Sequence, residues 1–231
     1  MSVICIKYRL LPTRAQETKL CATLAVCRDV YNSLITERTA LYETEKKSLT
    51  LYDQIPHLAT WKKAHSELSE VHSQVLQNVV VRVDLAFKAF FRRVKNGETP
   101  GYPRLKGRGV YDSITFPQLQ TGGCKLIGST VQVSKIGQVK AIIHRPLIGT
   151  PKTCTIRRQA GKWFACFSCE YEPVALPMSE EVVAIDVGLE KFAALSDGSF
   201  VDNPRFFRKD EKALAQAQRK QSKHPKGSKA R

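Results

Sequence analysis

The sequence predicts an α+β protein, in which a small antiparallel β-barrel module carries an inserted helical bundle and is followed by an incomplete α/β domain. Three observations predict this arrangement. Apolar residues recur at helical spacing within 13–100 and alternate with period two within 101–172. A new apolar strand then begins in 182–231, after a linker at 173–181 that contains prolines.

The first segment, residues 1–12, is predicted to be a strand, because polar and apolar side chains alternate until Pro12. No hairpin partner follows it. We therefore expect this strand to join the later β module, which makes the helical block 13–100 an insertion between the first and second strands.

The helical block begins at a predicted capping box formed by Thr13 and Gln16. Its first apolar pattern extends to Lys47 and fits either one helix or a helix-turn-helix-like pair with a break near 27–29. The strongest helical pattern covers 71–95, where eight apolar residues form a wide stripe.

The β module is predicted from six short strand-like runs separated by turns that contain Gly or Pro. This pattern is typical of a small antiparallel barrel or sandwich. In sequence order the runs are SITFPQ, CKLIG, TVQVS, QVKAIIHRP, TCTIRRQ and KWFACFSCEY.

The seven cysteines are odd in number and irregular in spacing, which argues against a disulfide framework. Cys166 and Cys169 form a CxxC that is compatible with half a zinc site. They lie in a strand-like run, however, where residues three apart point to opposite faces. We interpret them as ordinary strand cysteines.

The net charge of +16, from 37 Lys and Arg against 21 Asp and Glu, indicates a polyanionic partner. The excess is concentrated in 101–172 and 205–231, each with a net charge of +8, whereas 173–204 has −5. No apolar run approaches the roughly 20 residues that span a bilayer. Without a recognisable export signal, the expected location is the cytoplasm, with no membrane partner.

Asp186 is the candidate catalytic and metal-binding residue. It lies in the apolar run VVAIDVGL, where burying an unpaired carboxylate would cost several kcal/mol. The alternative is a carboxylate at a strand end, capped by nearby amides. A carboxylate that faces DNA is readily explained by Mg²⁺ between them, as in two-metal phosphodiester hydrolysis. Asp202 is a weaker candidate, and Asp197 is interpreted as a turn former.

Several segments in the same order resemble the TnpB (OrfB-type) family of insertion-sequence proteins. The C-terminal segment AIDVGLEKFAALSDGSF and the residues after it resemble the first RuvC motif and the following helix of the family. The resemblance also includes YRLLPTRAQETKL, CRDVYNSLITER, SEVHSQVLQNVVVRVDLAFKAFFRR, GYPRLK and HRPLIGTPKTCTIRRQAGKWFACFSCEYE.

The resemblance implies an RNA-guided DNA endonuclease of a transposon, related to type V CRISPR effectors. It implies a β (wedge) module, a helical recognition lobe and an RNase H-like (RuvC) domain. Guide RNA and target DNA would be its partners, and base pairing would supply most of the specificity. Three carboxylates would hold Mg²⁺, and Asp186 matches the first of them.

The departures from the family pattern affect the expected activity. The family's other two acids and its zinc-finger cysteines have no counterpart up to residue 231, so its zinc site is absent from this sequence. We therefore expect a truncated chain that does not cleave DNA by itself. A second polypeptide that supplies the missing part is an open alternative, and the oligomeric state is not predicted.

Fourteen residues are candidates for nucleic-acid contact. The alternatives are a solvated helix face for Gln77 and for the C-terminal basic helix, and a mobile basic loop for the residues at 104–108. Matching positions place Tyr52, Ser73 and Gln77 where the family reads the motif beside the target; a Gln amide can pair with adenine. Two further groups are predicted to contact phosphate or guide RNA. These are Arg104, Lys106 and Arg108 in one loop, and Arg157, Arg158 and Lys162 around a hairpin. A basic helix face completes the set, with Arg205, Arg208, Lys209, Arg219 and Lys220.

Three functions remain open at this level. The first is a TnpB-family nuclease that is truncated. The second is a nuclease-dead DNA-binding repressor or guide-RNA-binding module. The third is a guide-independent accessory DNA-binding protein of a transposon.

Overall fold

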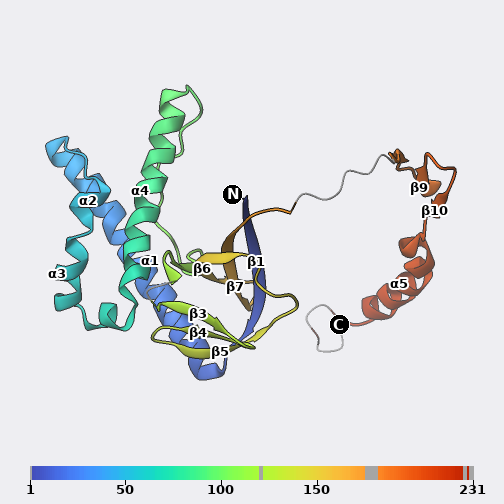
Figure 1. Cartoon of the computed structure of the whole chain (residues 1–231), viewed down its shortest axis with the longest axis horizontal. Coiled ribbons are helices and arrows are strands. Elements are labelled where there is room, and N and C mark those ends of the chain that lie inside the picture. Colours follow the sequence, from blue (N-terminus) through green and yellow to red (C-terminus); the bar gives the residue numbers. More distant parts are fainter. Residues whose placement is uncertain (1, 120–121, 175–181, 226–227, 229–231) are drawn as a thin grey trace. The chain divides into compact units, whose positions relative to one another are not determined.

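The computed structural model describes residues 2–119, 122–174, 182–225 and 228 (Figure 1). The chain divides into two compact units, residues 1–174 and 175–231. This division falls within the expected linker, of which 175–181 lies outside the described residues. No helix in the described ranges is long and apolar enough to cross a membrane.

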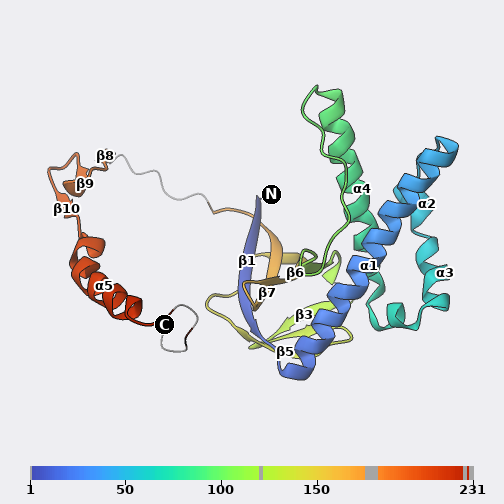
Figure 2. The same ribbon diagram turned by 180° about the vertical axis from the view of Figure 1, so that it is seen from behind.

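The first unit contains a seven-stranded antiparallel sheet in the order β2-β6-β7-β1-β5-β4-β3. Strand β1 lies in its middle: it pairs with β7 from Ser2↔Tyr171 to Leu10↔Trp163, and its end also pairs with β5. The helical block is therefore inserted between β1 and β2 (Figures 1 and 2). The strands are β1 Ser2–Leu11, β2 Ser113–Phe116, β3 Cys124–Ile127, β4 Thr130–Val133, β5 Gly137–Ile142, β6 Thr150–Gln159 and β7 Lys162–Tyr171.

The sheet curls around a core that includes the buried rings of Tyr8, Phe116 and Phe167. Strands β2 and β3 are the two edge strands of the sheet, and they do not pair with each other in the described residues. The predicted barrel is therefore not closed by hydrogen bonds between these two strands. Side chains alternate strictly along β7. Cys169 is buried and Cys166 half-buried, which confirms that the CxxC cysteines point to opposite faces.

The helical block consists of α1 Arg14–Glu45, α2 Leu51–Gln54, α3 His57–Ala64, the 3₁₀ helix η1 Ser66–Glu70 and α4 Ser73–Lys95. The capping box of Thr13 and Gln16 is present at the start of α1. Helix α1 is continuous, so the alternative of a break near 27–29 is wrong for this chain. Buried Cys27, Val30 and Tyr31 continue the apolar stripe through that stretch, and nothing there favours a turn.

Helices α1 and α4 pack together through their apolar stripes and a buried polar cluster. Arg38 of α1 donates from Nε to Gln54 Oε1 at 2.6 Å and pairs with Asp84 of α4 at 3.5 Å. The Gln54 amide in turn donates to Leu34 O and to Glu37 Oε2. Burial lowers the pKa of Arg38, while the Asp84 carboxylate opposes that shift. The cluster joins α1, α2 and α4, because each of them contributes one of its groups.

Arg82 connects α4 to the sheet. Its guanidinium donates to Ser113 O at 2.7 Å and to Thr115 Oγ1 at 2.8 Å on β2, and its Nε donates to Asn78 Oδ1. It also lies over the Tyr111 ring, 5.4 Å from the centroid. The helical block and the sheet therefore form one body with a shared core.

His72 caps α4 and makes its stability sensitive to pH. Its Nδ1 accepts from the backbone N–H of Gln74 at 3.3 Å, which requires a neutral ring. Burial, with the nearby Lys62 and Lys135, lowers the pKa of His72. The folded protein therefore binds a proton at His72 less readily than the unfolded chain does. As the pH falls below about 6.5, the ordinary pKa of histidine, protonation favours the unfolded chain and the free energy of unfolding decreases.

We expect the free energy of unfolding to fall between about pH 7 and pH 5, and His72→Asn to flatten this dependence while keeping a capping side chain. Urea unfolding of both proteins at several pH values measures it. Parallel pH profiles for the two proteins would show that His72 does not titrate as argued.

The second unit contains β8 Ile185–Asp186, β9 Lys191–Leu195, β10 Phe200–Asp202 and α5 Phe206–Ser222. The strands form an antiparallel sheet in the order β10-β9-β8. Among its described apolar residues only Ala193 is buried, whereas Ile185, Phe200 and Phe207 are each more than 60% exposed. The described residues of 182–231 therefore bury little apolar surface of their own.

Candidate nucleic-acid interface

The basic strap, residues 104–110, connects the helical block to the sheet and is fixed along α1. The side chain of Asn32 donates to Lys106 O at 3.0 Å and accepts from Lys106 N at 2.8 Å, as a paired strand would. The Lys106 ammonium lies 5.9 Å from the Tyr31 ring centroid. Arg104 and Arg108 are exposed, and within the described ranges neither guanidinium has a hydrogen-bond or ion-pair partner. The strap thus presents two free guanidinium groups on a held backbone.

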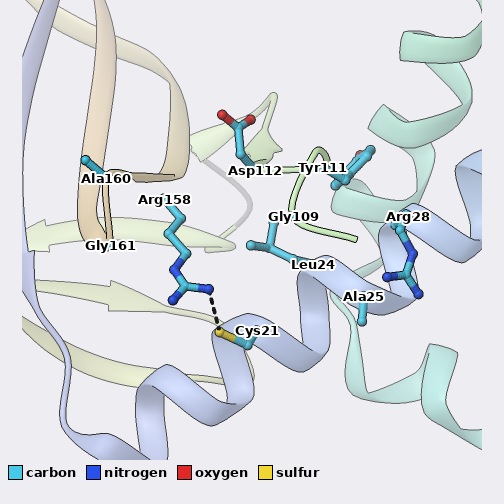
Figure 3. Close-up of a pocket in the computed structure, with 10 residues that line it drawn as sticks. All are labelled: Cys21, Leu24, Ala25, Arg28, Gly109, Tyr111, Asp112, Arg158, Ala160 and Gly161. Atoms are coloured by element: carbon cyan, nitrogen blue, oxygen red, sulfur yellow. Dashed lines mark hydrogen bonds between the residues drawn. The ribbon is translucent and has the colours of Figure 1, made fainter. Parts of the chain in front are cut away.

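The β6–β7 hairpin carries the second predicted basic group. Arg157 pairs with Asp112, with both Nε and Nη2 at 3.0 Å from Oδ2. Arg158 reaches toward α1, where its guanidinium is 3.8 Å from Cys21 Sγ and 3.9 Å from Glu17 Oε1 (Figure 3). The two arginines therefore contact different partners, because neighbouring residues on a strand point to opposite faces. Both remain about half exposed, and Lys162 is exposed beside them.

A cavity of about 320 Å³ lies between α1, the end of the strap and the hairpin (Figure 3). Arg28, Arg158 and Asp112 line it, and the Asp112 carboxylate accepts from Arg157. Backbone of Gly109 and of the Ala160–Gly161 turn forms other parts of its wall, where no bulky side chain blocks the approach of a ligand. The Arg28 guanidinium donates to Asp29 Oδ1 from Nε at 2.9 Å and from Nη2 at 2.7 Å. The half-exposed Arg158 guanidinium suits phosphate oxygens, because an arginine fork donates in a fixed planar geometry.

Ser73 and Gln77 lie one turn apart on an exposed face of α4. The Ser73 hydroxyl accepts from Lys62 Nζ at 2.8 Å, which attaches α3 to the start of α4. The Gln77 amide has no partner in the described part of the chain and is available to a ligand. Tyr52 is 80% exposed on α2, and no contact joins it to the other two. Ser73 and Gln77 thus lie together, whereas Tyr52, the third residue predicted to read the motif beside the target, does not join them.

Helix α5 presents the predicted basic face. At about 100° per residue, the five predicted basic residues fall within an arc of about 120°, with Lys212 and Lys223 among them. Asp210 and Glu211 fall on the other side. All five are exposed. Arg205 precedes the helix in a left-handed conformation, with φ of 46°, so its backbone marks the start of the helix.

Asp186 ends β8, opposite Ala194 of β9, and it is exposed in the described part of the chain. Its carboxylate therefore carries no burial cost there, and it lies at a strand end. Asp202 accepts from Lys191 Nζ at 2.7 Å, and Asp197 accepts from the Ser199 N–H and hydroxyl in a turn, as predicted. Each interaction lowers the pKa of its carboxyl.

The acids do not converge on a metal site within the described residues, where no three His, Cys, Asp or Glu side chains come together. The residues near Asp186 therefore do not fit a two-metal centre, which needs several carboxylates around ions about 3.5–4 Å apart. No magnesium-dependent step follows from this geometry.

Arg28 and Asp112 line the cavity but are not among the candidates predicted from the sequence. Arg28 has a signal in the sequence, since Cys21, Ala25 and Arg28 recur at helical spacing and all line the cavity. Asp112 has no such signal in the sequence, because its place beside the cavity depends on the β6–β7 hairpin, which brings Arg157 next to it.

Two family models match the chain. The model of the OrfB type of IS605 elements, described as a probable transposase, matches residues 166–231. The model of the helix-turn-helix domain of the same proteins matches residues 2–47, which here contain β1 and the single helix α1.

Two curated proteins are similar over nearly the whole chain. One, from Escherichia coli (strain K12), is named "Putative RNA-guided DNA endonuclease InsQ"; it is 31% identical over 228 residues, covering 96% of this chain and 54% of that protein. Another, from Streptomyces pristinaespiralis, is named "Putative RNA-guided DNA endonuclease"; it is 31% identical over 226 residues, covering 96% and 55%. The chain spans about half the length of these relatives.

A solved structure, a Cas12f1–sgRNA–target DNA complex, aligns with 94% of this chain and 61% of its own chain, at 13% identity and a TM-score of 0.44. That score is too low to establish a common fold. The family models and the two curated relatives agree with each other and cover both ends of the chain. The chain belongs to the TnpB (OrfB) family of IS605-type elements.

Proposed function

We propose that residues 1–174 bind nucleic acid through the strap, the hairpin and the cavity between them, as the binding part of an RNA-guided DNA endonuclease system. Guide RNA and target DNA are the proposed partners. The observation that carries this proposal is the strap: its backbone is fixed to Asn32, and Arg104 and Arg108 are exposed and unpaired in the described residues.

The physical argument is preorganisation. A guanidinium on a mobile loop loses conformational entropy when it binds phosphate, whereas one on a held backbone loses less. The net charge of +8 over 101–172 adds long-range attraction for a polyanion. The names of the two curated relatives are consistent with this assignment.

We also propose that 182–231 is the beginning of a RuvC-like domain, with Asp186 at the position of its first acid and as its candidate Mg²⁺ ligand. The support is the match of residues 166–231 to the transposase model and the antiparallel strands that precede α5.

Removing the free cations of the strap tests the binding proposal. We expect Arg104→Ala with Arg108→Ala to weaken binding of RNA and DNA at low salt. Each lost phosphate contact should also reduce the slope of log K against log salt concentration by about 1. Fluorescence anisotropy over a salt series measures both quantities.

The matched control is Lys125→Ala with Lys140→Ala, which removes two exposed charges from β3 and β5. Equal losses in both double variants would show that net charge alone, and not the strap, determines binding. Sequencing of RNA that copurifies after expression beside the transposon ends tests the guide: recovery of a defined transposon-end RNA supports it, and random host RNA favours guide-independent binding.

A further inference from the structure

An aromatic pocket in the helical block is lined by residues from the last turns of α1 and α4 and from the segments that follow them. Both helices end away from the sheet (Figures 1 and 2). The volume of the pocket is about 220 Å³, smaller than the 300–1,000 Å³ typical of sites for drug-sized ligands. It is therefore suited to a single ring system. It is lined by Arg38, Tyr42, Ser48, Leu49, Phe87, Phe90, Phe91 and Tyr102.

The aromatic rings form a connected wall. Tyr102 meets Phe87 edge-on at 5.7 Å and Phe90 at 5.3 Å between centroids, and Phe90 meets Phe91 at 5.2 Å. Phe87 is buried, whereas Phe91 is 57% exposed at the mouth. The Tyr102 hydroxyl is within 3.1 Å of Thr39 Oγ1, which fixes that ring against α1. The wall offers ring faces held in place before any ligand arrives.

A buried cation supports one side of the pocket. The Arg38 guanidinium lies 5.1 Å from the Phe87 ring centroid and is only 6% exposed. Gln54 and Asp84 hold it there. The Arg38 guanidinium therefore packs against the Phe87 ring on one side of the pocket.

One further cation contacts a ring of the pocket, and three more lie in the helical turn that follows Phe91. Lys46 Nζ lies 5.6 Å from the Tyr42 ring centroid. Arg92, Arg93 and Lys95 occupy the last turn of α4, next to Phe91. An apolar pocket bordered by Lys and Arg is complementary to a ligand that joins an aromatic ring to a phosphate chain, and less so to an apolar peptide.

We propose that this pocket takes one unpaired base of a single-stranded nucleic acid, stacked on Phe91 and with a neighbouring phosphate at Lys46. The base must be unpaired because the rings of a duplex are already stacked on their neighbours. This inference rests on the proposed nucleic-acid binding and adds to it a site for single strands, separate from the strap. RNA and DNA share the required chemistry.

The test compares three replacements of Phe91 in the full chain, with short single strands of RNA, the same sequence as DNA, and the corresponding duplexes. We expect Phe91→Ala to weaken single-strand binding by roughly five- to hundredfold, with little change for duplex. Phe91→Leu keeps apolar volume without a π face and should lose nearly as much, whereas Phe91→Trp should retain binding. The RNA and DNA arms identify which strand supplies the base.

Photocrosslinking gives a second readout. Single strands that carry 5-iodouracil, irradiated with the wild-type protein, should crosslink to a peptide of 87–102. Retained single-strand binding by Phe91→Leu, or crosslinks only elsewhere, would overturn the pocket and indicate an apolar protein ligand or none. Strap variants that weaken binding while Phe91 variants do not would reject only this inference; no binding of any nucleic acid would reject the proposed function as well.

Discussion

Asp84→Ala is expected to lower the free energy of unfolding of the first unit by about 3–5 kcal/mol, because it leaves Arg38 charged and buried without its partner. Arg38 is 6% exposed and pairs with Asp84 across the α1–α4 contact. The remaining bond to Gln54 offers a neutral acceptor only. Denaturant unfolding followed by far-UV circular dichroism measures the change.

Lys88→Ala is the control for this prediction. Lys88 pairs with the same carboxylate at 2.9 Å, but its side chain is 72% exposed. Its removal should cost at most about 0.5–1 kcal/mol, because water screens the pair. A loss below about 1 kcal/mol in Asp84→Ala would show that Arg38 finds solvent or another acceptor, and that the cluster does not hold α1 and α4 together.

Gly149→Ala is expected to destabilise the sheet by about 2–5 kcal/mol, the combined cost of a left-handed residue and of overpacking. Gly149 precedes β6 with φ of 74°, and an added Cβ would collide with the backbone carbonyl of Glu170 and lie 2.7 Å from Tyr171 Cβ. Neither obstacle is the flexible end of a side chain, so β7 or the turn must move.

Gly128→Ala separates the two causes. Gly128 has φ of 53° in the β3–β4 turn, and nothing lies within 4 Å of its added Cβ. Only the conformational cost of roughly 1–2 kcal/mol applies there. Equal losses in the two variants, measured by thermal and urea unfolding, would contradict a collision at Gly149.

Local patterns in the sequence were sufficient to predict most elements of the fold. The run KWFACFSCEY corresponds to β7, and the stripe of 71–95 corresponds to α4 with its preceding turn. The continuity of α1 was harder to predict, because Cys27 and Tyr31 fill core positions in the middle of the helix. A pattern of aliphatic residues alone does not include these two positions. The exposure of Asp186 was not predictable, since burial of a strand depends on which layers cover it, and periodicity does not report that.

The candidate site was predictable in composition but not in arrangement. The basic character of 101–172 follows from counting charges, yet the sequence does not show that Asn32 holds the strap or that Asp112 engages Arg157. Those contacts join residues separated by 74 and 45 positions. The aromatic pocket likewise needs Tyr102 to return to α4, which only the path of the chain after that helix determines.

The central place of β1 has a consequence for the order of events during synthesis. Ser2 pairs with Tyr171, and most of β1 pairs only with β7. Strand β1 therefore lacks its main partner until almost the whole unit has been translated. At about 5–20 residues per second, that interval is roughly 10–30 seconds. The α1–α4 contacts form from a shorter stretch of chain, and the sheet must await its last strand. We therefore expect β1 to pair with β7 in the last step of folding of this unit. Until then the unpaired edge of β1 must be protected from aggregation with other chains.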